Sequence, residues 1–100
     1  MVWGKAALLR FKRAARDEAL NPIVLDSCVH LLPRVTVDGS EMVLGAWIEH
    51  YGIETEAGHY ICYRNIGNKL FKLDDAIARE VDQSNHTTST SVTLMLYLKQ

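Results

Sequence analysis

The chain has 100 residues, 48% of them hydrophobic and 23% charged, which is enough for one compact domain with a single core. Its net charge of −1 excludes a strong long-range attraction to nucleic acid or to anionic lipid, so we expect neither a nucleic-acid nor a membrane partner. Two cysteines, Cys28 and Cys62, are too few for a disulfide framework, and no apolar run reaches the ~20 residues of a membrane span. We therefore expect a protein of the cytoplasm or nucleus.

The N-terminal residues have the spacing of an amphipathic helix. At ~100° per residue, hydrophobic residues fall on one side and basic residues on the other. The hydrophobic side holds Trp3, Ala7, Leu8, Phe11, Ala14 and Ala15, and the basic side holds Lys5, Lys12, Arg13 and Arg16. The pattern predicts a helix over residues 3–20, which ends before Asn21-Pro22 because the residue before a proline disfavours the helical conformation.

Short apolar or alternating runs predict strands in the rest of the chain. In chain order they cover residues 23–31, 34–37, 42–51, 58–64, 69–73 and 92–98. Asp38-Gly39 is a turn dipeptide, so the second and third of these strands are expected to form a hairpin.

The segments between the strands are short and polar. Residues 52–57 and 83–91 are expected to be loops, and residues 76–82 either a helical turn or an edge strand. The expected fold is a single α+β domain over residues 1–100, with a helix in 1–20 and a mainly antiparallel sheet in 23–100.

A histidine and a carboxylate at hairpin spacing are the first candidates for chemistry. His59 lies in one expected strand, and Asp74 directly follows the next. A carboxylate that accepts the Nδ1 proton of an imidazole fixes its tautomer, so that Nε2 can deprotonate a thiol or hydroxyl. Such a pair, taken alone, is more often a surface contact than a catalytic dyad.

Four motifs between residues 42 and 98 carry a resemblance to a known family. They are LGAWIEHYG at 44–52, GHYICY at 58–63, LFKLDD at 70–75 and TLMLY at 93–97. In this order and spacing they resemble the C-terminal, histidine-bearing part of the ubiquitin-specific proteases, which are papain-like cysteine peptidases. The third motif has Leu70 where the family has a tryptophan, which removes packing near the carboxylates.

The resemblance implies roles for individual residues. His59 would be the general base and Asp74 the group that orients it, with Asp75 as a neighbouring carboxylate. Gly58 and Tyr60 would support the channel for the C-terminal tail of ubiquitin, in which glycine lets the backbone approach closely. No metal or cofactor is implied.

The family's nucleophilic cysteine has no counterpart here. Strand alternation puts Cys62 on the face opposite His59. Cys28 lies in an apolar run, where burial would keep it an unreactive thiol. The cysteines and histidines also match no zinc-finger spacing, so we expect no metal site.

The resemblance implies thiol-dependent hydrolysis of the isopeptide bond after the C-terminal glycine of ubiquitin, once a part bearing the cysteine box is supplied. The implied partners are ubiquitin or a ubiquitinated protein, and a lobe or chain with that box. Two alternatives remain: an inactive remnant that binds ubiquitin or another protein, and a module whose basic helix binds acidic surfaces. Because one helix cannot cover a wide sheet, Trp47 and Tyr60 are expected to be partly exposed.

Overall fold

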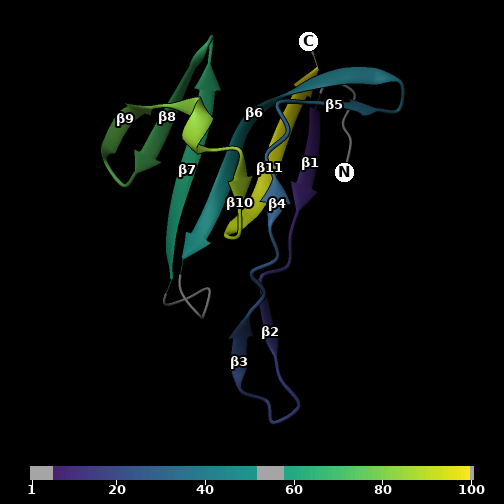
Figure 1. Ribbon diagram of the computed structural model, residues 1–100, viewed down its shortest axis with the longest axis vertical. Helices are drawn as coiled ribbons and strands as arrows, with labels where there is room; N and C mark the ends of the chain where they lie inside the picture. The colour runs from purple at the N-terminus through teal and green to yellow at the C-terminus, as the bar shows by residue number, and fades with distance from the viewer. Residues whose placement is uncertain (1–5, 52–57, 100) are drawn as a thin grey trace.

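The computed structural model describes residues 6–51 and 58–99, which form a mainly antiparallel β-structure (Figure 1). Its strands are β1 (Ala6–Arg10), β2 (Ala14–Arg16), β3 (Pro22–Val24), β4 (Val29–His30), β5 (Arg34–Val37), β6 (Ser40–Tyr51), β7 (His59–Ile66), β8 (Lys69–Asp74), β9 (Ile77–Val81), β10 (Thr88–Ser89) and β11 (Val92–Lys99). A single 3₁₀ turn, η1 (Gln83–Asn85), completes the described secondary structure. In this part of the chain, no helix has the length and hydrophobicity that a membrane crossing needs.

Seven strands form one sheet in the order β1-β11-β6-β7-β8-β9, with β5 also paired to β6. Each neighbouring pair is antiparallel. Two short ribbons, β2 with β3 and β4 with β10, lie outside this sheet. Figure 1 shows the β2–β3 hairpin projecting away from the sheet, whereas the β4–β10 ribbon lies against it.

The expected N-terminal helix is wrong for the described residues. Ala6–Arg10 form β1, paired with Leu94–Leu98 of β11, and Ala14–Arg16 form β2. Helix propensity is a weak preference, and β11 would otherwise present a row of unpaired backbone groups at the edge of the sheet. Pairing with that edge overrides the helical spacing. The part of the expected helix before residue 6 lies outside the described residues.

The expected buried strand over residues 23–31 is also wrong. The chain forms the exposed strand β3, then an irregular segment, then the two-residue strand β4. Cys28 lies in the irregular segment and is exposed, so the sequence was misleading about its burial. Apolar periodicity over so short a run cannot tell a core strand from a covering segment.

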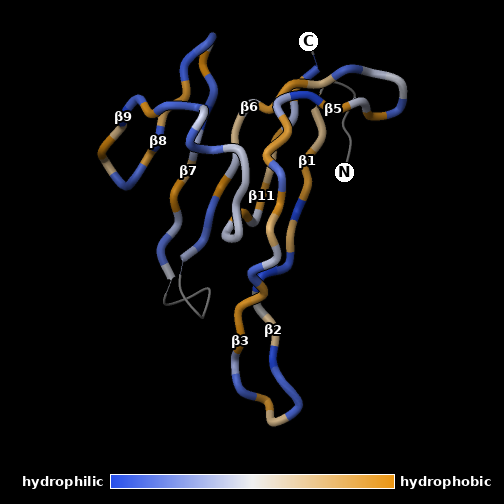
Figure 2. Tube along the Cα trace, viewed as in Figure 1, coloured by the Kyte–Doolittle hydropathy of each residue, from blue (hydrophilic) through white to orange (hydrophobic). Residues whose placement is uncertain are grey.

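The hairpins of the main sheet agree with the sequence. Asp38 and Gly39 have φ angles of 50° and 79° and join β5 to β6, as the turn dipeptide predicts. Residues 76–82 contain the edge strand β9, one of the two alternatives, and Figure 2 shows both hydrophobic and hydrophilic residues along β8 and β9. The expected loop 52–57 lies outside the described residues.

A β-bulge in β6 keeps the buried side chains of both halves of this long strand on the same face of the sheet. The pairing with β11 shifts between Ala46 and Leu44, which leaves Gly45 as the extra residue. Buried positions in β6 accordingly change phase, from Met42 and Leu44 before the bulge to Trp47 after it. Without the extra residue, strict alternation would send Leu44 and Trp47 to opposite faces.

The core lies on one face of the sheet, under irregular segments rather than under a helix. Its largest fully buried side chains are Tyr97, Met42, Leu70, Met95 and Val92. Hydrogen bonds fasten the covering segments to the sheet. Leu44 N donates to Pro33 O (2.9 Å), His50 N to Ser91 O (2.9 Å), and the side-chain hydroxyl of Tyr97 to Leu32 O (2.7 Å).

This cover changes the expectation for exposed aromatic residues. Trp47 is only 3% exposed and stacks on Tyr63 at 4.9 Å between ring centroids, so its predicted exposure is wrong. Tyr60, which points to the other face, is 49% exposed, as predicted. Segments 31–33 and 86–91 thus cover the face of the sheet that the expected helix would have covered.

The buried Arg13 connects three parts of the fold. Its Nε donates to the carbonyl of Val92 at 2.8 Å, and its Nη1 donates to the carbonyls of Leu25 and Ser27 at 3.1 and 2.7 Å. The side chain is 8% exposed, although the helical spacing placed it among solvated cations. The fork geometry of a guanidinium lets one side chain satisfy carbonyls from separate segments.

We predict that Arg13→Ala lowers the free energy of unfolding by about 2–4 kcal/mol, because three carbonyls lose a charge-assisted donor in a buried place. Arg13→Lys should recover little of this, since an ammonium cannot reach all three carbonyls. Urea unfolding followed by circular dichroism measures both. Arg16→Ala is the matched control, because Arg16 is exposed and, among the described residues, donates to the carbonyl of Leu20 alone. Equal losses at Arg13 and Arg16 would contradict the assignment.

Candidate active site

The candidate site lies where β6, β7 and β8 end beside one another. His59 is the first residue of β7, and Tyr51 at the end of β6 is its cross-strand partner. On the other side of β7, Cys62 pairs with Leu73, so Asp74 lies diagonally across from His59 on the same face. His59 Nε2 is 2.7 Å from Asp74 Oδ1. The hairpin therefore brings together the two residues that the sequence singled out.

The ring nitrogen that meets Asp74 differs from the expectation. The expected arrangement has Nδ1 at the carboxylate and Nε2 at the reacting thiol, whereas the structure joins Nε2 to Asp74. A charged Asp74 accepts the Nε2 proton, and the lone pair of a neutral ring is then on Nδ1. Among the described residues Nδ1 has no hydrogen-bond partner, so it is the nitrogen available for proton transfer.

The pair is solvated, with the side chains of His59 and Asp74 49% and 40% exposed. Water screens the attraction between charges at such a site, so the pair contributes little to folding stability. The pair instead orients His59, because the hydrogen bond selects one rotation of the imidazole ring and one tautomer.

Two residues of the site were not identified from the sequence. Glu49 is 6% exposed, and its carboxylate accepts a hydrogen bond from the Tyr51 hydroxyl at 2.6 Å. Burial, then the hydrogen bond and charge of Glu49, raise the pKa of Tyr51, so its hydroxyl stays protonated. Alternation from Trp47 through Glu49 to Tyr51 was the available signal, since all three share the face of His59.

Asp75 is close to the pair but comes from a turn. Its φ of 52° is left-handed, and its carboxylate lies within 4.8 Å of ligand atoms of His59 and Asp74. Exposed acidic groups commonly gather in this way without an ion, so the proximity alone does not define a metal site.

Gly58 and Tyr60 are packed around His50, on the face opposite His59. A Cβ added to Gly58 would collide with the imidazole of His50 and lie 2.7 Å from the carbonyl oxygen of Tyr51. Tyr60 contacts the same imidazole, with 4.5 Å between ring centroids. Glycine is therefore required at 58 by the neighbouring strand. The side chain of Tyr60 therefore points away from the His59–Asp74 pair.

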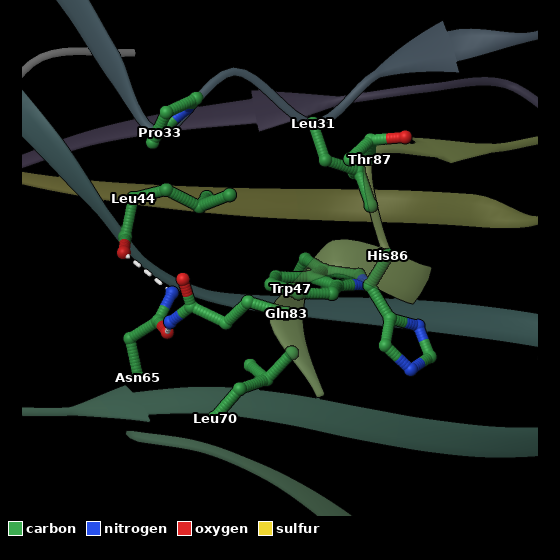
Figure 3. A pocket seen from close by; sticks show the side chains of 9 residues that line it. All are labelled: Leu31, Pro33, Leu44, Trp47, Asn65, Leu70, Gln83, His86 and Thr87. Carbon is green, nitrogen blue, oxygen red and sulfur yellow. Dashed lines mark hydrogen bonds between the residues drawn. The ribbon is translucent and has the colours of Figure 1, made fainter. Parts of the chain in front are cut away.

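Leu70 replaces the tryptophan of the resembling family without losing its place in the core. It is 1% exposed and lines a hollow of about 150 Å³ together with Trp47 and Asn65 (Figure 3). Asn65 Nδ2 donates to the carbonyl of Leu44 at 3.0 Å, which ties β7 to β6 across one wall of the hollow. The strand that ends at Asp74 is thus anchored at its other end.

The cysteines do not complete the site. Cys62 is in β7, and alternation turns it to the face opposite His59; burial raises the pKa of its thiol. Cys28 is exposed and makes no hydrogen bond to any described histidine.

We predict that iodoacetamide at neutral pH modifies Cys28 well before Cys62. A raised pKa lowers the thiolate fraction below that pKa, so the rate at Cys62 should keep rising at pH values where a free thiol has reached its plateau. Mass spectrometry of the Cys28→Ser and Cys62→Ser variants separates the two reactions. Fast modification of Cys62, independent of pH from about 5 to 8, would contradict the assignment and indicate an activated thiol.

Comparisons with known proteins identify the family and the fold of the chain. The family model of ubiquitin carboxyl-terminal hydrolases matches residues 11–97. No curated protein matches the chain. A structure of the yeast SAGA DUB module is similar at TM-score 0.82, with 19% identity over 96% of this chain and 23% of that one.

Two further solved structures have the same fold. The SAGA DUB module of Ubp8, Sgf11, Sus1 and Sgf73 bound to monoubiquitin gives TM-score 0.81 and 20% identity, over 96% of this chain and 23% of that one. An essential yeast splicing factor gives TM-score 0.74 and 16% identity, over 96% of this chain and 25% of that one.

The fold is thus the sheet region of a ubiquitin-specific protease domain. Because the family model covers most of the sequence, the chain belongs to the ubiquitin carboxyl-terminal hydrolase family. It spans about a quarter of the length of the solved chains that it matches.

Proposed function

We propose that this chain supplies the histidine and carboxylate of a thiol-dependent ubiquitin isopeptidase site. The observation that carries the proposal is the contact of His59 Nε2 with Asp74 Oδ1 at 2.7 Å, which leaves Nδ1 for a thiol. Membership of the ubiquitin carboxyl-terminal hydrolase family supports ubiquitin as the substrate.

In the proposed reaction, Nδ1 of His59 accepts the proton of a cysteine thiol that this chain does not provide. The thiolate attacks the carbonyl carbon of the C-terminal glycine of ubiquitin, and the resulting imidazolium returns its proton to the leaving lysine amine. Water then cleaves the thioester, again with His59 as base. Asp74 stabilises the imidazolium in both halves of the reaction.

A partly exposed apolar row supports contact of this sheet with a further lobe of the protein. Cross-strand pairs join Leu94 to Ile48, Ile48 to Cys62 and Cys62 to Leu73, on the face opposite the core. All four side chains are only partly buried. Since the chain spans about a quarter of the matched structures, we propose that a further part of the protein packs on this row, whereas the thiol approaches His59 from the other face.

A non-catalytic role is the second candidate. Neither cysteine is placed to react with His59, and one similar structure is described as a splicing factor. The sheet would then bind ubiquitin or another protein without cleaving it. The alternative of a basic helix binding acidic surfaces has lost its basis, because residues 6–16 contain two strands and Arg13 is buried.

A chimaera tests the catalytic proposal. This chain replaces the corresponding quarter of an active ubiquitin-specific protease, and hydrolysis of a fluorogenic ubiquitin C-terminal amide is measured. We expect activity, with His59→Ala reducing kcat by about 10³-fold or more and Asp74→Asn by about 10–10³-fold, because the first removes the base and the second only its orientation.

Asp75→Asn is the matched control and should lose less than Asp74→Asn. Circular dichroism checks that each chimaera is folded. A folded chimaera that binds ubiquitin without cleaving it would favour the non-catalytic role, and activity unaffected by His59→Ala would contradict the proposed base. The isolated chain should form no adduct with a ubiquitin C-terminal electrophile.

A further inference from the structure

Two cations lie directly opposite each other on β8 and β9. Lys72 pairs with Arg79 in the antiparallel register. Side chains at directly opposed positions lie about 4.5–5.5 Å apart at Cβ, and like charges there are destabilising. The fold therefore maintains a repulsive contact at this position.

This cation pair faces the same side as the candidate active site. Lys72 and Asp74 are two residues apart in β8, so their side chains share a face, and Arg79 shares it as the partner of Lys72. A hollow of about 100 Å³ lies between them, lined by Lys72, Asp74, Ile77 and Arg79. The hollow adjoins the carboxylate that orients His59.

The other face of the same two strands has the opposite arrangement. Lys69 Nζ lies 3.9 Å from Glu80 Oε1, so a cation of β8 is compensated there by an anion of β9. On the face of His59, no described carboxylate forms an ion pair with Lys72 or Arg79. The pairing of β8 with β9 thus places opposite charges together on one face of the sheet. On the face of His59 it places two positive charges together.

The open side of Arg79 is accessible to a ligand. β9 is the last strand in the order of the main sheet, and Arg79 is exposed. An extended peptide can lie along such an edge and turn alternate side chains toward one face.

We propose that Lys72 and Arg79 form a subsite for a carboxylate side chain of an acidic peptide segment next to the scissile bond. The inference rests on the proposed function, because it assigns the acidic segment to the protein whose lysine carries ubiquitin. Arg79 offers a planar fork for a carboxylate, and Lys72 adds a second positive charge. A bound carboxylate relieves the repulsion between the two cations.

The charges around the subsite favour a carboxylate over the phosphates of a nucleic acid. Asp74 lines the same hollow, and the net charge of the chain is −1. A run of phosphates needs an extended basic surface, whereas a hollow of about 100 Å³ holds a single acidic group.

Binding of a fluorescein-labelled peptide of alternating glutamate and serine to the 100-residue chain tests the proposal. The glutamine analogue and a single-stranded DNA of similar length are compared by fluorescence anisotropy at low salt. We expect the glutamate peptide to bind at least about fivefold tighter than either, and Lys72→Gln with Arg79→Gln to weaken it at least about fivefold.

The matched control is Lys69→Gln with Arg64→Gln, which removes two cations from the opposite face of the sheet and should change affinity less than about twofold. Equal loss in the two double variants, or equal binding of the glutamine peptide, would overturn the subsite. Tighter binding of the DNA would reassign it to phosphate. The assay needs neither ubiquitin nor a catalytic cysteine, so a failed chimaera beside the expected peptide binding would reject only the proposed function.

Discussion

The register of β7 between β6 and β8 is the constraint on which the candidate site depends. It places His59 beside Tyr51 and within 2.7 Å of Asp74, and the core residues Ile61 and Tyr63 fall on the same face. A slip of β7 by one residue would turn His59, Ile61 and Tyr63 together to the other face, away from the core and from Asp74. Burial of Ile61 and Tyr63 therefore fixes the face from which the imidazole projects, although the imidazole is itself half exposed.

In the described part of the chain, no α-helix covers the core face of the wide sheet. Irregular segments fastened by Arg13, Pro33 and Ser91 cover one face, and the bulge at Gly45 keeps the long strand β6 facing that cover along its length. On the other face, the row from Leu94 to Leu73 is only partly buried. The chain thus has a buried core on one face of the sheet and partly exposed apolar side chains on the other.

Local sequence signals predicted the central hairpins and the pairing of His59 with Asp74, because turn dipeptides and strand alternation act over short distances. They failed at the N-terminus, where pairing of residues 6–10 with β11 depends on a strand almost ninety positions away. They also failed for Trp47, since its cover comes from segments without periodicity. The nitrogen that meets Asp74 was missed because the rotation of the ring is set by its hydrogen bond in the folded site, not by spacing in the sequence.

We infer that the hydrogen bond to Asp74 keeps the proton of the neutral His59 ring on Nε2 and leaves Nδ1 free to accept a proton from a thiol. Long-range ¹H–¹⁵N correlation spectra of the ¹⁵N-histidine-labelled chain measure this directly, with the His59 signals assigned by their loss in His59→Gln. At a pH where the ring is neutral, we predict a proton on Nε2 in the wild-type chain and a mixture of tautomers in Asp74→Ala. A proton on Nδ1 in the wild-type chain, or a tautomer unchanged by Asp74→Ala, would contradict the account.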